Sequence, residues 1–168
     1  FATQVLVTNG IRLADADFAP RAIAAGIDVV ILSLDAFDPK VQERLYGGRA
    51  VYRQVLEGLQ NALAAPGVEV VLAAVVTAPN AALLPRYMEE VARLQRRHRK
   101  SIGVLLHALQ RPARNGAEQK RLPLGMLDAA RLVGRALSRA RALGVTALTF
   151  SFPPCLLKGH EQNVVELY

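Results

Sequence analysis

Polar residues follow the first two apolar runs of the chain, at the point where each run ends. Thr8 and Asn9 close the first run, and Ser33 and Asp35 close the second. The carboxyl edge of a parallel α/β sheet or barrel is where ligands bind. A hydroxyl and a carboxylate at such an edge can hydrogen-bond a ribose diol or an ammonium group. These residues therefore predict a small molecule lying across neighbouring strand ends.

Each of these residues also has a structural explanation. Asn9 precedes Gly10, and an Asn-Gly pair tolerates positive φ and makes tight turns. Asp35 could cap the next turn, and Ser33 could be a core hydroxyl with its hydrogen bonds made locally. Side chains alternate along a strand, so Ser33 and Asp35 point to the same side, which in a barrel can be the lumen. The spacing alone leaves both explanations open.

Four further polar residues lie within or after the later runs. Thr77 and Asn80 follow the third run, where Asn80 either caps the next helix, forms an Asx turn or contacts a bound nucleoside. Arg114 lies in the polar loop 109–122, where it is either solvated or pairs with a carboxylate. His107 lies within the fourth run, where a lone histidine is more often a hydrogen-bonded core residue than a ligand.

The single cysteine is Cys155, which follows two prolines just past the last apolar run. One cysteine allows no intrachain disulfide, which fits a reducing compartment. No second cysteine or spaced histidine pair gives a zinc signature. An isolated cysteine is more often a small buried hydrophobe, whereas a place at the ligand edge favours ligation of an iron–sulfur cluster.

Hydrophobic periodicity alternates between buried strand and amphipathic helix along the whole chain. Strands are predicted at 4–8, 28–34, 69–77, 102–108 and 145–152, and helices at 17–25, 39–45, 51–64, 84–97 and 123–143. Strands that alternate with helices indicate an α/β fold with a parallel sheet and right-handed crossovers. The 168 residues suffice for one domain with a sizeable core. Five strands suit either an open doubly wound sheet or part of a barrel.

The chain has a formal net charge of +7, and part of the excess is the basic run Arg96, Arg97, Arg99 and Lys100. This run is either a solvated helix end or a surface for polyanions. Nucleic acid is not favoured as a partner, because no aromatic residues interleave with these charges. No apolar run reaches the roughly 18–20 residues of a membrane helix, and no signal peptide is visible, so a cytoplasmic location is expected.

An ordered set of short motifs over about the first eighty residues resembles the radical S-adenosylmethionine (SAM) superfamily. The motifs are Thr8-Asn9-Gly10, Gly26-Ile27-Asp28, Ser33-Leu34-Asp35-Ala36, Asp38-Pro39, Leu45-Tyr46-Gly47-Gly48 and Val55-Leu56-Glu57-Gly58-Leu59. The resemblance implies a partial (β/α)6 barrel of the TIM type. Residues 1–152 would supply its third and later strands, and residues 153–168 would begin a C-terminal extension. We expect a chain that is cut at both ends.

The resemblance also implies SAM bound across the strand tips. Ser33 and Asp35 correspond to contacts with the ribose or amino-acid part, and the turn at Thr8 and Asn9 lies near the same site. The complete set of implied SAM contacts is Thr8, Asn9, Ser33, Asp35, Thr77, Asn80 and Arg114. The Pro-Pro-Cys segment resembles the entry to an extension that binds auxiliary clusters, which makes Cys155 a candidate ligand.

The family's CxxxCxxC motif, which holds the [4Fe–4S] cluster, is absent from this sequence. The resemblance therefore implies cluster ligands outside the chain and a fragment that is inactive alone. The intact enzyme would reductively cleave SAM, with an electron donor such as flavodoxin or ferredoxin, and start radical chemistry on a small molecule or peptide. Two alternatives stay open: a non-redox TIM-type or other α/β enzyme that binds a phosphorylated metabolite, and a basic nucleic-acid-binding module.

Overall fold

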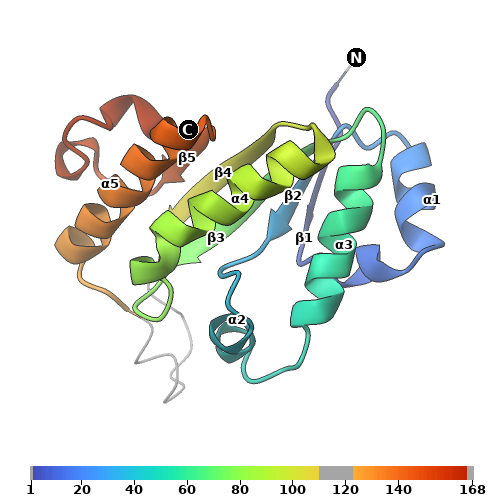
Figure 1. The fold of residues 1–168 in the computed structure, drawn as a ribbon, viewed down its shortest axis with the longest axis horizontal. Helices are drawn as coiled ribbons and strands as arrows, with labels where there is room; N and C mark the ends of the chain where they lie inside the picture. Colours follow the sequence, from blue (N-terminus) through green and yellow to red (C-terminus); the bar gives the residue numbers. More distant parts are fainter. Residues whose placement is uncertain (1, 110–122, 166–168) are drawn as a thin grey trace.

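The computed structural model describes residues 2–109 and 123–165 and forms one sheet of six strands (Figure 1). The strands are β1 (Val5–Thr8), β2 (Val29–Ser33), β3 (Glu69–Val76), β4 (Ile102–Ala108), β5 (Ala147–Phe150) and β6 (Val164–Val165). The first five lie within the predicted runs. The sixth is absent from the prediction, because a strand of two residues has no detectable periodicity.

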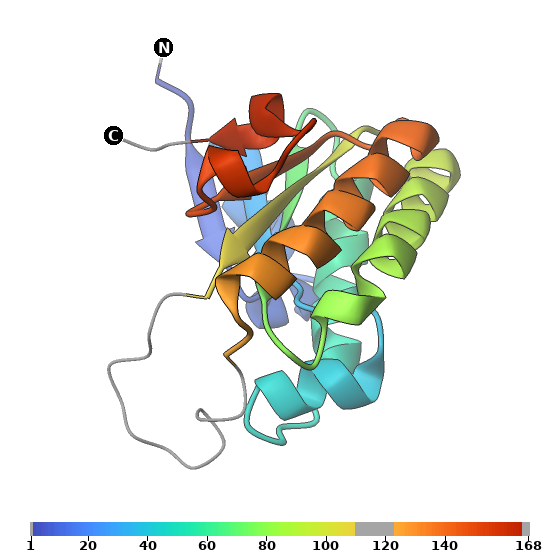
Figure 2. The ribbon, with the colours of Figure 1, turned by 90° about the vertical axis from the view of Figure 1, so that its left-hand side faces the viewer.

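The strand order is β1-β2-β3-β4-β5-β6, and every neighbouring pair is parallel. A doubly wound sheet reverses its strand order at a switch point, and this sheet has no such reversal. The α/β class and the parallel βα repeats are thus confirmed, and the sequential order is that of part of a TIM-type barrel. Figure 2 shows α4 and α5 on one side of the sheet and an open face on the other.

The helices follow the predicted segments closely. They are α1 (Phe18–Ala24), α2 (Pro39–Leu45), α3 (Tyr52–Ala64), α4 (Leu84–His98) and α5 (Met126–Leu143). Short 3-10 turns precede α1 and α4, namely η1 (Ile11–Ala14) and η2 (Ala81–Leu83), and two more lie between β5 and β6, namely η4 (Pro154–Leu156) and η5 (Glu161–Asn163). Asp38 caps α2 by accepting a hydrogen bond from the Val41 amide at 3.0 Å. Among the helices of the described ranges, none is both long and apolar enough to cross a bilayer.

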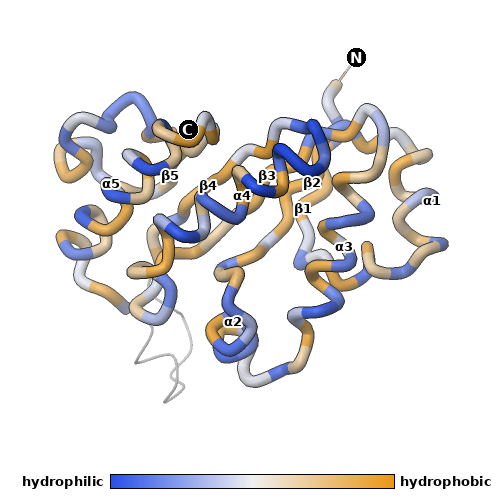
Figure 3. The backbone as a smooth tube through the Cα atoms, viewed as in Figure 1, coloured by the Kyte–Doolittle hydropathy of each residue, from blue (hydrophilic) through white to orange (hydrophobic). Residues whose placement is uncertain are grey.

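The core lies between the helices and one face of the sheet. Leu32, Leu72 and Leu106 of the sheet are fully buried and belong to the same cluster as Leu59 and Met88 of the helices. Their neighbours along each strand point to the open face and are more exposed. Figure 3 shows apolar strands beside an α4 whose outer surface is hydrophilic. The two faces of the sheet therefore meet different surroundings.

The turn after β1 packs directly on α3. Gly10 is buried with φ of +79°, a conformation that side chains rarely adopt. A Cβ atom placed on Gly58 of α3 would lie 2.1 Å from the carbonyl oxygen of Gly10. Only a glycine at this point of α3 lets the helix approach the turn.

Gly58→Ala should destabilise the protein by about 3 kcal/mol, because the added methyl group must displace backbone. Gly134→Ala is the matched control, since Gly134 is also inside a helix and its Cβ would only reach ordinary contact with His160 at 3.9 Å. The control should be stabilised by up to about 1 kcal/mol through helix propensity. Urea unfolding measures the free energy of unfolding of both variants. Equal values for Gly58→Ala and Gly134→Ala would contradict the close approach of α3 to the Gly10 carbonyl.

Candidate functional site

The open face carries Ser33 and Asp35 at the carboxyl end of β2 and His107 at the carboxyl end of β4, with β3 between these strands. In the register of the sheet, Ser33 aligns with Ala73 and Val75 aligns with His107. The Asp35 carboxylate accepts a hydrogen bond from the Val75 amide at 2.7 Å, so Asp35 and His107 flank Val75. Strands lie about 4.8 Å apart, which separates the two residues by roughly 10 Å. The exposed Val75 side chain lies between them on the same face.

Burial alters the acid–base behaviour of both residues. Desolvation raises the pKa of Asp35 to about 6, against the opposing effect of the Val75 amide. Desolvation lowers the pKa of His107, whose ring makes an edge contact with Phe150 at 5.2 Å between centroids. Within the described ranges, Asp35 has no cationic partner. The face thus presents a carboxylate that can still gain a positive or hydrogen-donating partner.

The loop after β2 is fixed by two buried carboxamides. Gln42 of α2 accepts hydrogen bonds from the amides of Asp35 and Ala36 through Oε1, each at 2.9 Å. Asn80 donates through Nδ2 to the carbonyl oxygens of Asp35 and Val75, each at 2.8 Å. Both carboxamides are fully or almost fully buried. They bind the backbone of Asp35 from both sides and leave its carboxylate on the open face.

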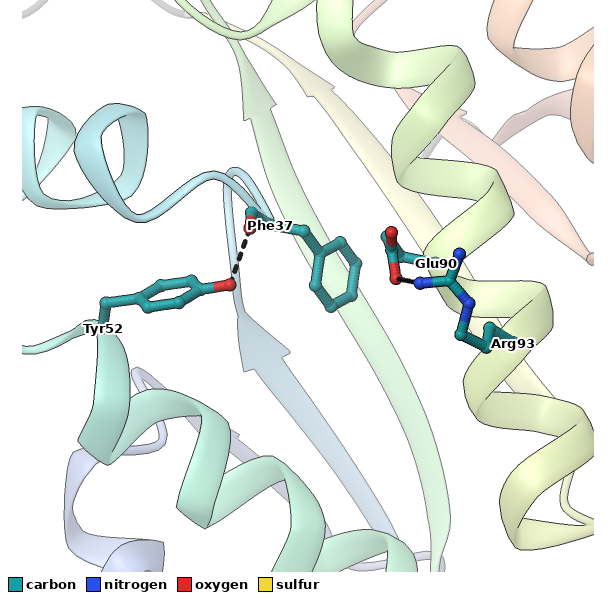
Figure 4. Close-up of polar contacts among 4 residues, drawn as sticks. All are labelled: Phe37, Tyr52, Glu90 and Arg93. Atoms are coloured by element: carbon teal, nitrogen blue, oxygen red, sulfur yellow. Dashed lines mark hydrogen bonds and ion pairs between the residues drawn. The ribbon is translucent and has the colours of Figure 1, made fainter.

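Two tyrosines complete the hold on this loop. Tyr87 donates its hydroxyl to the Leu34 carbonyl at 2.9 Å, and its ring lies 4.8 Å from that of Phe37. Tyr52 of α3 donates to the Phe37 carbonyl at 2.6 Å, while the Phe37 ring points toward α4, where Glu90 pairs with Arg93 (Figure 4). The helical spacing of Tyr87 predicts only a core residue. Its hydroxyl contact was therefore missed by sequence reasoning.

The turn after β1 uses its own side chains. The Thr8 hydroxyl accepts a hydrogen bond from the Gly10 amide at 3.1 Å, and the Asn9 side chain accepts one from the Ile11 amide at 3.2 Å. This confirms the tight turn predicted for the Asn-Gly pair. The role of Thr8 and Asn9 in ligand binding stays a prediction.

Thr77 and Asn80 are both buried and form hydrogen bonds with one another. Asn80 Oδ1 accepts hydrogen bonds from the Thr77 amide at 2.8 Å and from the Thr77 hydroxyl at 2.9 Å. The expectation that Asn80 caps the next helix is wrong, because its oxygen turns back to Thr77 and makes no cap hydrogen bond. In this structure the pair fixes the tips of β2 and β3.

The remaining predicted residues lie away from the open face or outside the described ranges. Arg114 falls in the part of the chain that the structure does not describe. Cys155 is exposed in η4, and within the described ranges no group of three or more His, Cys, Asp or Glu residues could hold a metal ion. In the basic run, Lys100 donates to the Ala65 carbonyl at 2.8 Å at the end of α3. Arg97 lies exposed at the end of α4.

Comparison with known proteins gives a partial match to a curated protein. No protein-family model matches the chain. The chain is 36% identical over 95 residues to a protein of Methanopyrus kandleri named probable GTP 3′,8-cyclase. The match covers 56% of this chain and 30% of that protein, so this chain spans less than a third of its relative.

Asn80→Ala should lower the free energy of unfolding by about 3 kcal/mol, because it leaves buried backbone groups of Asp35, Val75 and Thr77 without partners. Asn61→Ala is the control, since Asn61 makes one side-chain hydrogen bond, to the Leu13 carbonyl at 2.7 Å. That variant should lose about 1 kcal/mol. Chemical denaturation measures both losses of stability. A loss for Asn80→Ala no larger than for Asn61→Ala would contradict a stabilising role of the Asn80 hydrogen bonds to the loop after β2.

Asp35→Asn should change how stability depends on pH. The pKa of Asp35 is about 6 in the folded protein and has an ordinary value of 3.8, so the folded state binds more protons between these values. The free energy of unfolding of the wild type should therefore fall as pH rises from about 4 to about 6. The variant keeps an acceptor for the Val75 amide and cannot ionise. Urea unfolding between pH 4 and 7 should show this decrease in the free energy of unfolding in the wild type only. An equal decrease in Asp35→Asn would show that Asp35 is not its source.

Proposed function

We propose that the chain forms part of the barrel of a radical SAM enzyme and that Ser33 and Asp35 bind SAM on the open face. The main support for this proposal is the Asp35 carboxylate at the carboxyl end of β2. Its backbone is held by hydrogen bonds, and it has no cationic partner in the described ranges. The relative supports the proposal, because GTP 3′,8-cyclases belong to the radical SAM family.

The donor and acceptor pattern of this face fits SAM. SAM carries an ammonium group and a ribose diol, which donate hydrogen bonds, and a carboxylate, which accepts them. One oxygen of Asp35 is used by the Val75 amide, and the other oxygen can accept from such a donor. Ser33 lies on the same side of β2 and contributes a hydroxyl that can donate or accept. The hydrogen bonds of Gln42 and Asn80 to the loop hold these groups in a fixed position, which reduces the entropy lost on binding.

The [4Fe–4S] cluster of the family does not fit on this chain. Such a cluster is held mainly by cysteine thiolates, and the sequence has only Cys155. The described ranges also contain no group of residues suited to a metal. We therefore derive no cleavage step from this chain. The proposal places the cluster ligands elsewhere in a longer protein, where the cluster would supply the electron for reductive cleavage of SAM.

The proposal for the whole protein extends to its substrate and electron donor. The intact enzyme would act on a small molecule or peptide and take electrons from a flavodoxin or ferredoxin. The contribution of this chain is to bind and orient. Asp35 would accept a hydrogen bond from SAM, and the apolar side chains of the open face would keep water from the bound molecule.

Isothermal titration of the chain with SAM at pH 7.5 tests the proposal. Asp35→Asn should weaken binding at least tenfold, because it removes the charge, and Ser33→Ala should weaken it several-fold. Asp38→Asn is the matched control: it also removes one carboxylate from the same loop, and it keeps an oxygen for the Val41 amide. This control should bind SAM as the wild type does.

Two results would overturn the proposal. One is a wild-type chain that is folded by circular dichroism and does not bind SAM. The other is equal affinity of the wild type and Asp35→Asn, which would place SAM elsewhere. With dithionite added, this chain should release no 5′-deoxyadenosine, because the ligands of the cluster are absent from its sequence.

A further inference from the structure

A second polar concavity lies on the helical side of the molecule, between α5 and the segment 155–160. Figure 1 shows this segment beside α5. Its polar lining comes from both walls: Arg131, Arg135 and Ser138 of α5, and Lys158 and His160 of the segment. We refer to it as the α5 groove. Neither the proposed SAM site nor the relative accounts for these residues.

The α5 groove has an excess of positive charge. Arg135 and Lys158 are exposed and have no carboxylate partner in the described ranges. Arg131 pairs with Asp128 at 3.4 Å, but both side chains are mostly exposed, so the pair is weak. The Glu161 carboxylate follows the segment, and backbone amides of Glu161 and Gly159 lower its pKa. Three cations, Arg131, Arg135 and Lys158, thus stand against the two exposed carboxylates of Asp128 and Glu161.

His160 lines the same groove from the side of the segment 155–160. The Ser138 hydroxyl donates to the Gly134 carbonyl at 3.0 Å, so its oxygen acts as the acceptor toward His160 Nε2 at 3.1 Å. This contact fixes the ring on α5. The other ring nitrogen, Nδ1, is buried and has no hydrogen-bond partner among the described residues.

We infer that the α5 groove binds a phosphate group, held by Arg131, Arg135 and Lys158 beside the ring of His160. The planar guanidinium matches two oxygens of a phosphate at once, and Lys158 adds a point charge. The source is inorganic phosphate or a phosphate monoester, which share this chemistry. The inference does not depend on the proposed SAM site, because the residues that line the groove include neither Ser33 nor Asp35.

The single cysteine provides a local probe, because Cys155 is exposed and also lines the groove. A small trifluoromethyl label on Cys155 allows fluorine NMR of the whole chain. Inorganic phosphate, titrated at constant ionic strength, should shift this signal to saturation in the millimolar range or below. In protein without the trifluoromethyl label, the backbone amide shifts caused by phosphate should concentrate in residues 127–138 and 155–160. A second titration with glycerol 3-phosphate distinguishes the sources: tighter binding than phosphate assigns the groove to a monoester, and weaker binding assigns it to the free ion.

The double variant Arg135→Ala, Lys158→Ala should weaken phosphate binding at least tenfold. The control is Arg49→Ala, Arg97→Ala, which removes the same charge from exposed positions elsewhere and should stay within twofold of the wild type. All four side chains are on the surface, so both variants should fold, as circular dichroism can verify. Shifts that never saturate, or equal weakening in both double variants, would overturn the inference and leave only general attraction to a basic protein.

Discussion

The arrangement of the candidate site depends on the hydrogen bonds that two buried carboxamides make to the loop after β2. Gln42 accepts from two successive amides of this loop, and Asn80 donates to its Asp35 carbonyl. Because loop backbone has no strand or helix partner, its buried polar groups need side chains or water. The carboxamides meet this need from α2 and from the end of β3. The loop thereby acquires the rigidity of the elements around it.

A fixed backbone explains how a poorly solvated carboxylate can persist at Asp35. Its charge is opposed by burial and supported by only one amide, that of Val75, in the described ranges. Such an arrangement costs stability, and the surrounding hydrogen bonds must offset that cost. Strain of this kind is typical of positions that bind a ligand, because the ligand supplies the missing partner. Asp35 differs in this respect from Asp38, whose exposed side chain caps α2.

The sequential strand order gives the molecule two sides with different chemistry. Successive right-handed crossovers without a reversal place the helices on one side and leave the other face of the sheet uncovered. The uncovered face carries Ser33 and Asp35 among apolar residues. The helical side carries exposed arginines, and the phosphate groove proposed beside α5 lies there.

The sequence by itself determined the helices, the first five strands, the tight turn at Asn9 and the common side of Ser33 and Asp35. These features depend on periodicity and turn chemistry within about ten residues. Only the tertiary structure decided the strand order, the inward turn of Asn80 and the approach of Ser138 to His160. Asn80 and the Asp35 carbonyl are 45 residues apart in sequence, and Ser138 and His160 are 22 apart. No local pattern specifies such contacts, because they exist only once strands and helices have packed.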